Sequence, residues 1–409
     1  MPNITHHRFF LLSSMSILFL ILIINYLDRT VIAFAITPIQ QTFHLNNAQF
    51  GAIAGAFGIG YTLLMLISGI LVDHIKARKV LTFSLLLWSV ASICTGFANG
   101  FWMLFIFRIL LGVFEAPAFP SNIQIVSHWL PMTSRVKALS IGNAAIPLAC
   151  AIGAPLISNL ITRFDWRITY FILGGAGIIL SLLWLMIYRD NPKGHDNLEF
   201  SNTKHSSTVT WKFMLFNPTI LTNNLSYFAL GYLLFFSQTW LPGYLEQIYH
   251  LKLKSVGLFL IAPWLLAAIT VVLCAILSDK LYTKTNSLRI ARSHIIWICQ
   301  LLSAICLIPV ITYHNLTVAL IFITLSVGFG LAPNALFDST NIDLAKHRAG
   351  TNFGIMNTFC SAGAIIAPWI TGWLTHITGD FKAAILLMVI LTFSSVLAVI
   401  FFHHPDKYR

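Results

Sequence analysis

Long runs of apolar residues, separated by short polar stretches, follow one another along almost the whole chain. The hydrocarbon core of a bilayer is about 30 Å thick, so a helix needs about 20 apolar residues to cross it. The pattern predicts twelve transmembrane helices, at residues 10–40, 49–72, 79–97, 101–127, 138–161, 168–188, 217–242, 255–277, 292–312, 316–337, 351–374 and 382–402. Because most loops between them are short, we expect an all-α membrane protein whose consecutive helices run antiparallel.

The one long polar stretch, at 191–212, is rich in Ser, Thr and Asn. We expect it to be a cytoplasmic linker between two six-helix bundles, at residues 1–190 and 213–409. The two halves also resemble each other in sequence. AIGAPLISNLIT at 151–162 matches AIIAPWITGWLT at 364–375, and GILVDHIKARK at 69–79 is echoed by AILSDKLYTK at 275–284. Such internal repeats indicate two pseudo-symmetric bundles, an arrangement typical of transporters.

The composition and the charge pattern support a membrane location. Of the 409 residues 57% are hydrophobic and 9% are charged, whereas soluble domains carry about 25% charged residues. This composition excludes a soluble enzyme, and no nucleic-acid partner is expected despite the net charge of +12. When the N-terminus is placed in the cytoplasm, most Lys and Arg residues fall on the cytoplasmic side, as the positive-inside rule requires. Both termini are therefore expected in the cytoplasm.

Four fully charged side chains lie deep within predicted spans: Asp28, Arg29, Arg108 and Glu115. Each costs at least about 2.5–3.5 kcal/mol at the membrane centre, so such residues mark substrate or proton pathways by default. Arg108 and Glu115 are two helical turns apart and share one face, and Tyr26 lies one turn from Arg29. Two interpretations are open. The charges either neutralise each other and hold helices together, or the arginines bind a carboxylate while the acids carry protons.

Several motifs resemble a known family. GILVDHIKARKVL, with Gly69, Asp73, Arg78 and Lys79, is similar to the signature of the major facilitator superfamily, although Lys76 stands where Gly is usual. NYLDRTVIAFA at 25–35, RILLGVFEAPAFPS at 108–121, DWR at 165–167, TWLPGYLEQ at 239–247 and GFGLAPNALF at 328–337 resemble its anion:cation symporter family. That family includes bacterial galactonate and hexuronate transporters and the sialin and vesicular glutamate transporter group. The resemblance implies the major facilitator fold in a bacterial inner membrane.

The resemblance also assigns roles at matching positions. It implies proton coupling through Asp28 and Glu115, with Arg108 changing partners between Glu115 and other groups. It implies substrate binding by Arg29, Tyr61, Tyr26 and Asn357. A gate on the cytoplasmic side is expected to consist of Asp73, Arg78, Lys79 and Arg135.

These observations predict proton-coupled symport of an organic anion (a sugar acid, a carboxylate or an acidic amino acid) by alternating access. The expected partners are the anion, protons and the lipid bilayer, with the chain as a monomer and the proton gradient in place of a cofactor. The alternative is a major facilitator antiporter or exporter of drugs or metabolites, although Arg29 and Arg108 would repel cations. An enzyme is not expected, because the spans contain no nucleophile–base or metal-ligand pattern, and the six cysteines lack CxxC spacing.

Overall fold

The computed structural model describes residues 4–129, 132–189, 211–345 and 349–408, and every regular element in these ranges is a helix. The chain divides into two compact units. The first contains Met1–Leu45 and Ala56–Thr203, and the second contains Asn46–Gly55 and Lys204–Arg409. Most of the predicted linker at 191–212 lies outside the described residues, so its role as the boundary between two six-helix bundles stays a prediction.

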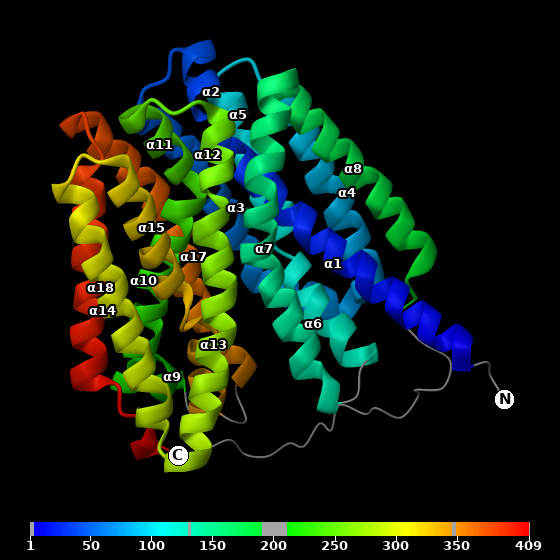
Figure 1. Ribbon diagram of the computed structural model, residues 1–409. Helices are drawn as coiled ribbons and strands as arrows, with labels where there is room; N and C mark the ends of the chain where they lie inside the picture. Colours follow the sequence, from blue (N-terminus) through cyan, green and yellow to red (C-terminus); the bar gives the residue numbers. More distant parts are fainter. Residues whose placement is uncertain (1–3, 130–131, 190–210, 346–348, 409) are drawn as a thin grey trace. The chain divides into compact units, whose positions relative to one another are not determined.

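The helices of the first unit pack around α4 (Ala77–Gly96) and α8 (Trp166–Ile187), which lie side by side in Figure 1. α1 (Ile4–Phe34) packs against α7 (Met132–Phe164) and α8, and α5 (Phe101–Glu115) packs against α4. The other helices with residues in this unit are α1 (Ile4–Phe34), α2 (Ile36–Phe43), α3 (Asn47–Ile75), α5 (Phe101–Glu115), α6 (Ala118–Trp129) and α7 (Met132–Phe164). α3 begins in the second unit and continues into this one.

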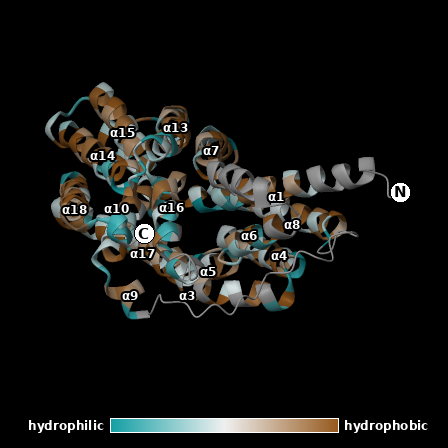
Figure 2. Ribbon diagram, turned by 90° about the horizontal axis from the view of Figure 1, so that it is seen from below, coloured by the Kyte–Doolittle hydropathy of each residue, from teal (hydrophilic) through white to brown (hydrophobic). Residues whose placement is uncertain are grey.

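The second unit is organised around α10 (Pro218–Thr239), which packs against α17 and α18. α14 (His294–Thr312) packs against α15 (Leu316–Leu331) and α18 (Lys382–Phe402) and lies between them in Figure 2. The other elements are α9 (Trp211–Phe216), α11 (Leu241–Tyr249), α12 (Leu253–Phe259), α13 (Ile261–Thr285), η1 (Arg289–Ser293), α14 (His294–Thr312), α15 (Leu316–Leu331), α16 (Asn334–Ala345), α17 (Ala349–Thr378), α18 (Lys382–Phe402) and η3 (Pro405–Tyr408).

The first residues of α3 belong to the second unit because they approach α17 closely. A side chain at Gly51 would collide with the backbone of Pro368 and Gly372 on α17. Phe50 meets the ring of Trp240 edge-on at 5.5 Å between centroids. Small residues at a helix contact let two backbones come together, as membrane helices require when no hydrophobic effect drives them into contact.

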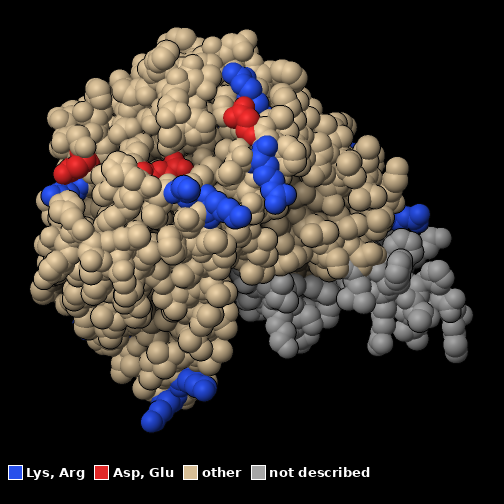
Figure 3. Space-filling view, turned by 45° about the horizontal axis from the view of Figure 1, so that its top comes forward, with Lys and Arg blue, Asp and Glu red and all other residues tan. Residues whose placement is uncertain are grey.

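The outer faces of both units are apolar. Figure 2 shows α13, α14, α15 and α18 to be hydrophobic over most of their length, and few charged side chains appear on the face drawn in Figure 3. Large exposed hydrophobic residues recur along these helices, among them Leu273, Ile305 and Phe393. Eleven helices in the described chain are long and apolar enough to cross a membrane.

The predicted span at 217–242 corresponds to α10, which is not among these eleven candidate spans. Its sequence contains Asn223, Asn224, Ser226 and Gln238, and all four side chains are buried. α10 is covered by α15, α16, α17 and α18 rather than exposed along its length. A helix enclosed by protein can carry hydrogen-bonding side chains that a lipid-facing helix cannot, so its mean hydropathy is lower.

The predicted spans at 101–127 and 316–337 are each interrupted, where the sequence pattern indicated single helices. α5 ends at Glu115 and α6 begins at Ala118, and the same break separates α15 from α16 at Ala332–Pro333. Each break contains an Ala-Pro pair, at 116–117 and 332–333. Proline has no N–H to donate and disfavours the helical conformation of the residue before it. The first break places Glu115 at the end of its helix.

Candidate functional site

The four charged residues predicted within spans come together in the first unit. Asp28 and Arg29 lie on α1, and Arg108 and Glu115 lie on α5. Their exposed fractions are 0%, 9%, 3% and 0% in that order. All four charges are therefore enclosed by protein, which is where ionisable groups in membrane proteins are tolerated.

Arg29 and Glu115 form an ion pair between α1 and α5. Arg29 Nε donates to Glu115 Oε2 at 2.6 Å, with both side chains buried. A hydrogen bond in which both partners are charged is shorter and stronger than a neutral one. The two residues are 86 positions apart, so the pair fixes the position of α1 against α5.

Three aromatic rings surround the Arg29 guanidinium. Its central carbon lies 4.8 Å from the ring centroids of Tyr26 and Phe57 and 4.7 Å from that of Tyr61. Arg108 also lies 5.6 Å from the Phe57 ring. A cation near aromatic rings is attracted to them electrostatically, and more strongly when water is excluded. The rings hold a positive charge in place without neutralising it.

A close approach of α3 to α5 positions two of these rings, those of Phe57 and Tyr61. A side chain at Gly112 would collide with the Phe57 carbonyl oxygen and the Tyr61 backbone nitrogen. Gly112 lies on α5 between Arg108 and Glu115, so the same helix contact sets the distance from both rings to both charges. Glycine is required here because only its lack of a side chain permits the contact.

Asp28 has a different partner. Its Oδ1 accepts a hydrogen bond of 3.0 Å from Ser92 Oγ on α4. Several charged atoms nearby are buried without any hydrogen-bond partner among the described residues: Asp28 Oδ2, Glu115 Oε1, and Nε and Nη1 of Arg108. Buried polar atoms are normally paired, so unpaired ones indicate a site that binds something else. Here unused donors and unused acceptors lie in one charged cluster.

The structure separates the predicted substrate residues into two groups. Tyr26 and Tyr61 surround Arg29 as described, in the first unit. Asn357 lies on α17 in the second unit, where it is half-buried. The sequence interpretation missed Phe57 and Ser92. Phe57 lies one helical turn before Tyr61 and could have been found from that spacing, but nothing in the local sequence links Ser92 to Asp28.

The predicted gate residues are partly described. Arg78 Nη2 donates to the Leu185 carbonyl oxygen near the end of α8, and Lys79 is exposed. The side chains of Asp73 and Arg135 lie outside the described part of the chain. Gln124 of α6 was not predicted. Its Oε1 accepts from Ala77 N at 2.8 Å and its Nε2 donates to the Val72 carbonyl, so it joins α3 to α4.

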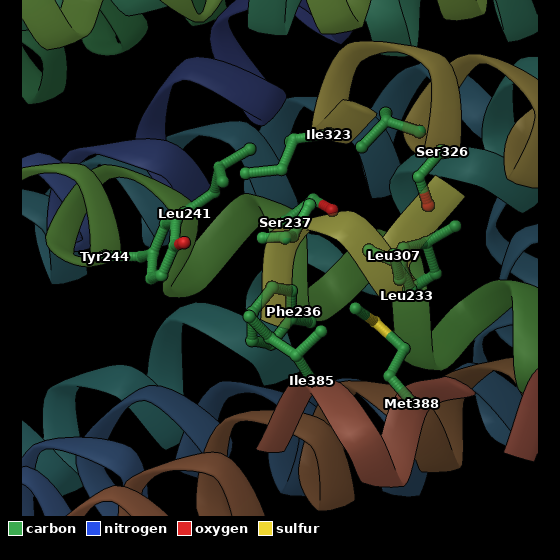
Figure 4. A pocket seen from close by; sticks show the side chains of 12 residues that line it. Leu233, Phe236, Ser237, Leu241, Tyr244, Leu307, Ile323, Ser326, Ile385 and Met388 are labelled. Atoms are coloured by element: carbon green, nitrogen blue, oxygen red, sulfur yellow. The ribbon is translucent and has the colours of Figure 1, made fainter. Parts of the chain in front are cut away.

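The second unit contains its own ionic and polar clusters. Arg292 pairs with Asp279 and Asp343, with both N···O distances at 3.7 Å. Farther inside, the Asn223 and Asn341 side chains both donate to Met356 Sδ, at 3.3 and 3.2 Å. The pocket in Figure 4 is formed in this unit by apolar side chains together with Ser237, Ser326 and Tyr244. It contains no charged residue to attract an anion.

Comparison with known proteins places this chain in a family. The model of the Major Facilitator Superfamily matches residues 18–368 and 287–409. A hexuronate transporter of Bacillus subtilis is 29% identical, over 95% of this chain and 93% of the relative. A probable galactarate/D-glucarate transporter of Bacillus subtilis is 28% identical, over 95% and 91%.

Among solved structures, a bacterial homologue of the human lysosomal transporter Spinster superposes with a TM-score of 0.83 at 17% identity, over 98% of each chain. This likeness establishes the fold, and the family match confirms the resemblance seen in the sequence motifs. The chain therefore belongs to the major facilitator superfamily and is an all-α membrane transporter rather than an enzyme.

Proposed function

We propose that this protein is a proton-coupled symporter of an organic anion, with sugar acids as the leading substrate class. The substrate class is supported by relatives named as hexuronate and galactarate/D-glucarate transporters. The preference for an anion over a cation is supported by the two buried arginines, because a guanidinium binds carboxylates through paired hydrogen bonds. Asn357 on α17 is proposed to contribute a polar contact to the same substrate.

The proposed coupling of proton and anion binding rests on one observation. Arg29 is hydrogen-bonded to Glu115, and buried charged atoms without hydrogen-bond partners surround this pair. When both acids are ionised, the two arginines and two carboxylates are balanced. Protonating Glu115 removes its charge and weakens its hold on Arg29. The Arg29 guanidinium then becomes available to the substrate carboxylate, so proton binding and anion binding favour each other.

Asp28 provides a second proton-binding carboxylate, and Arg108 provides a second guanidinium. Protonating Asp28 as well leaves two positive charges among buried groups, of which a monocarboxylate neutralises one and a dicarboxylate neutralises both. Arg108, with its unpaired Nε and Nη1, supplies donors that Glu115 and the substrate use in turn. A loaded site with little net charge crosses the membrane barrier at lower cost, and alternating access of the two halves then releases anion and protons together.

Glu115→Gln tests the coupling. In proteoliposomes with an acidic exterior, the wild type should accumulate D-glucuronate, and the variant should accumulate about as little as empty liposomes. Because glutamine keeps the shape and can still accept a hydrogen bond from Arg29, the variant should retain exchange of labelled for unlabelled D-glucuronate. The measurement compares radiolabel uptake with and without the pH gradient.

Asp380→Asn is the matched control. Asp380 lies outside the charged cluster, and an asparagine there can still accept from Lys382 N, as the aspartate does now at 3.0 Å. This variant should accumulate substrate as the wild type does. Unchanged proton-driven accumulation in Glu115→Gln would contradict the coupling role. Proton movement opposite to the substrate, recorded electrically, would contradict symport itself.

The substrate class has its own test. A panel of hexuronates, aldarates, dicarboxylates, acidic amino acids and organic cations is added to the purified protein, and the unfolding temperature is recorded. Ligands that bind the folded state raise this temperature by mass action. Sugar acids should give the largest increases, and an increase with organic cations alone would contradict the proposal.

A further inference from the structure

A cavity in the second unit lies away from the charged cluster and has no role in the proposed transport. It has a volume of about 120 Å³. Its border consists of Arg289 and Ser293 on η1, His294 and Trp297 at the start of α14, and Val399 and Ile400 near the end of α18. One water molecule needs roughly 10–15 Å³ measured in this way, so the space admits a larger group. Cationic and aromatic side chains form one wall and aliphatic side chains form the other.

The Arg289 guanidinium has unused binding capacity. It donates from Nη2 to the Ile400 carbonyl oxygen at 3.4 Å, and no ion pair joins it to a carboxylate within the described ranges. Asp406 accepts from the backbone N–H groups of Leu288 and Arg289 and from the Ser287 hydroxyl. Asp406 therefore caps the segment, and the guanidinium remains available to an anion.

His294 adds a neutral donor. Trp297 Nε1 donates to His294 Nδ1 at 2.9 Å. An indole N–H can only donate, so Nδ1 must be the unprotonated nitrogen and the ring proton lies on Nε2. The cavity thus offers the cationic fork of Arg289 and an N–H of His294, which are the groups that bind phosphate oxygens.

The position of the cavity indicates which phosphate compound it binds. Exposed apolar side chains lead away from it along both helices, at Ile298 and Leu302 on α14 and at Leu397 and Phe401 on α18. Exposed basic residues gather at the same end of the unit, at Lys280, Lys284 and Lys407. This end is the predicted cytoplasmic side, where tryptophan side chains occupy the level of the lipid headgroups. A free anion would use the basic groups but not the apolar surfaces.

We infer that this cavity binds the headgroup phosphate of an anionic phospholipid, whose acyl chains lie along the exposed faces of α14 and α18. Basic pockets between transmembrane helices are known to hold such headgroups. Arg289 binds the phosphate, His294 Nε2 donates to it, and Trp297 packs at the level of the glycerol backbone. The inference does not depend on the transported substrate.

Native mass spectrometry of the full chain tests this site. The protein is purified in detergent with equal amounts of phosphatidylglycerol and phosphatidylcholine, and the retained lipids are counted. The wild type should prefer phosphatidylglycerol by about fivefold, the effect of one cationic side chain near an anionic headgroup. Arg289→Gln should abolish this preference. Lys254→Gln, at an exposed lysine on α12 outside the cavity and away from the basic residues beside it, should keep it.

A second variant and a competitor complete the test. His294→Phe retains an aromatic ring but removes the donor to the phosphate. It should reduce the amount of phosphatidylglycerol retained by about half, which tests the site even if Arg289→Gln does not fold. Excess inorganic phosphate should not displace the lipid. The inference would be overturned by equal retention of both lipids by the wild type or by an unchanged preference in Arg289→Gln. Unchanged retention of phosphatidylglycerol in His294→Phe, or displacement by inorganic phosphate, would overturn it as well.

Discussion

Lys76 shows how one residue can carry backbone strain. It lies between α3 and α4 with φ 76° and ψ 144°, in a region that L-residues with a side chain rarely occupy. Its position in the family signature usually holds glycine, and the turn forms here with lysine instead. The turn is held from outside by Gln124, which accepts from Ala77 N and donates to the Val72 carbonyl.

Lys76→Gly should therefore stabilise the protein. Strained φ/ψ values cost about 1–3 kcal/mol each, and glycine removes most of that cost at an exposed position where no side-chain contact is lost. The expected result is a higher unfolding temperature of the purified protein. Lys79→Gly is the matched control, because Lys79 is exposed on α4 in helical conformation, where glycine should destabilise by about 1 kcal/mol. An equal decrease for both variants would show that Lys76 is not strained.

At the scale of elements, the contact between α3 and α5 positions the aromatic rings around Arg29. Gly112→Ala should separate the two helices, because the added methyl group meets backbone atoms of Phe57 and Tyr61, which cannot rotate away. Overpacking of this kind costs about 1–3 kcal/mol. We expect a lower unfolding temperature and a loss of D-glucuronate uptake, measured on the same preparation.

Gly175→Ala on α8 is the control for Gly112→Ala. Gly175 is also a helix residue, but a side chain there meets no neighbouring atom within 4 Å. Alanine favours helix over glycine by about 1 kcal/mol, so this variant should be as stable as the wild type or slightly more stable. If Gly112→Ala behaves like Gly175→Ala, the close contact between α3 and α5 does not position the site.

At the scale of the whole molecule, the charge pattern predicts which loops face the cytoplasm. Lys254 lies on α12 before α13 and is expected outside, and Lys284 lies in the last turn of α13 and is expected inside. Both side chains are exposed. Each is replaced by cysteine in a chain whose own cysteines are changed to serine. A membrane-impermeant maleimide should label Lys254→Cys in intact cells and Lys284→Cys only after permeabilisation. The reverse pattern would place both termini on the other side of the membrane.

The sequence alone determined the membrane location and most of the helices, because crossing the hydrocarbon core demands long apolar runs regardless of what packs beside them. It also singled out Asp28, Arg29, Arg108 and Glu115, since burying a charge in a bilayer is too costly to occur without a partner or a role. The contact of Tyr26 with Arg29 followed from helical spacing. The interruption at Pro117 was missed because hydropathy does not change across it.

Only the tertiary structure decided which charges meet. Arg108 and Glu115 share one face of α5, yet the hydrogen bond of Glu115 goes to Arg29, and Asp28 binds Ser92 from α4. Such pairings depend on how far each helix is rotated and how closely two helices approach. Those quantities are set by side-chain packing between segments far apart in the chain, at positions such as Gly112, and a hydrophobic pattern along one segment does not encode them.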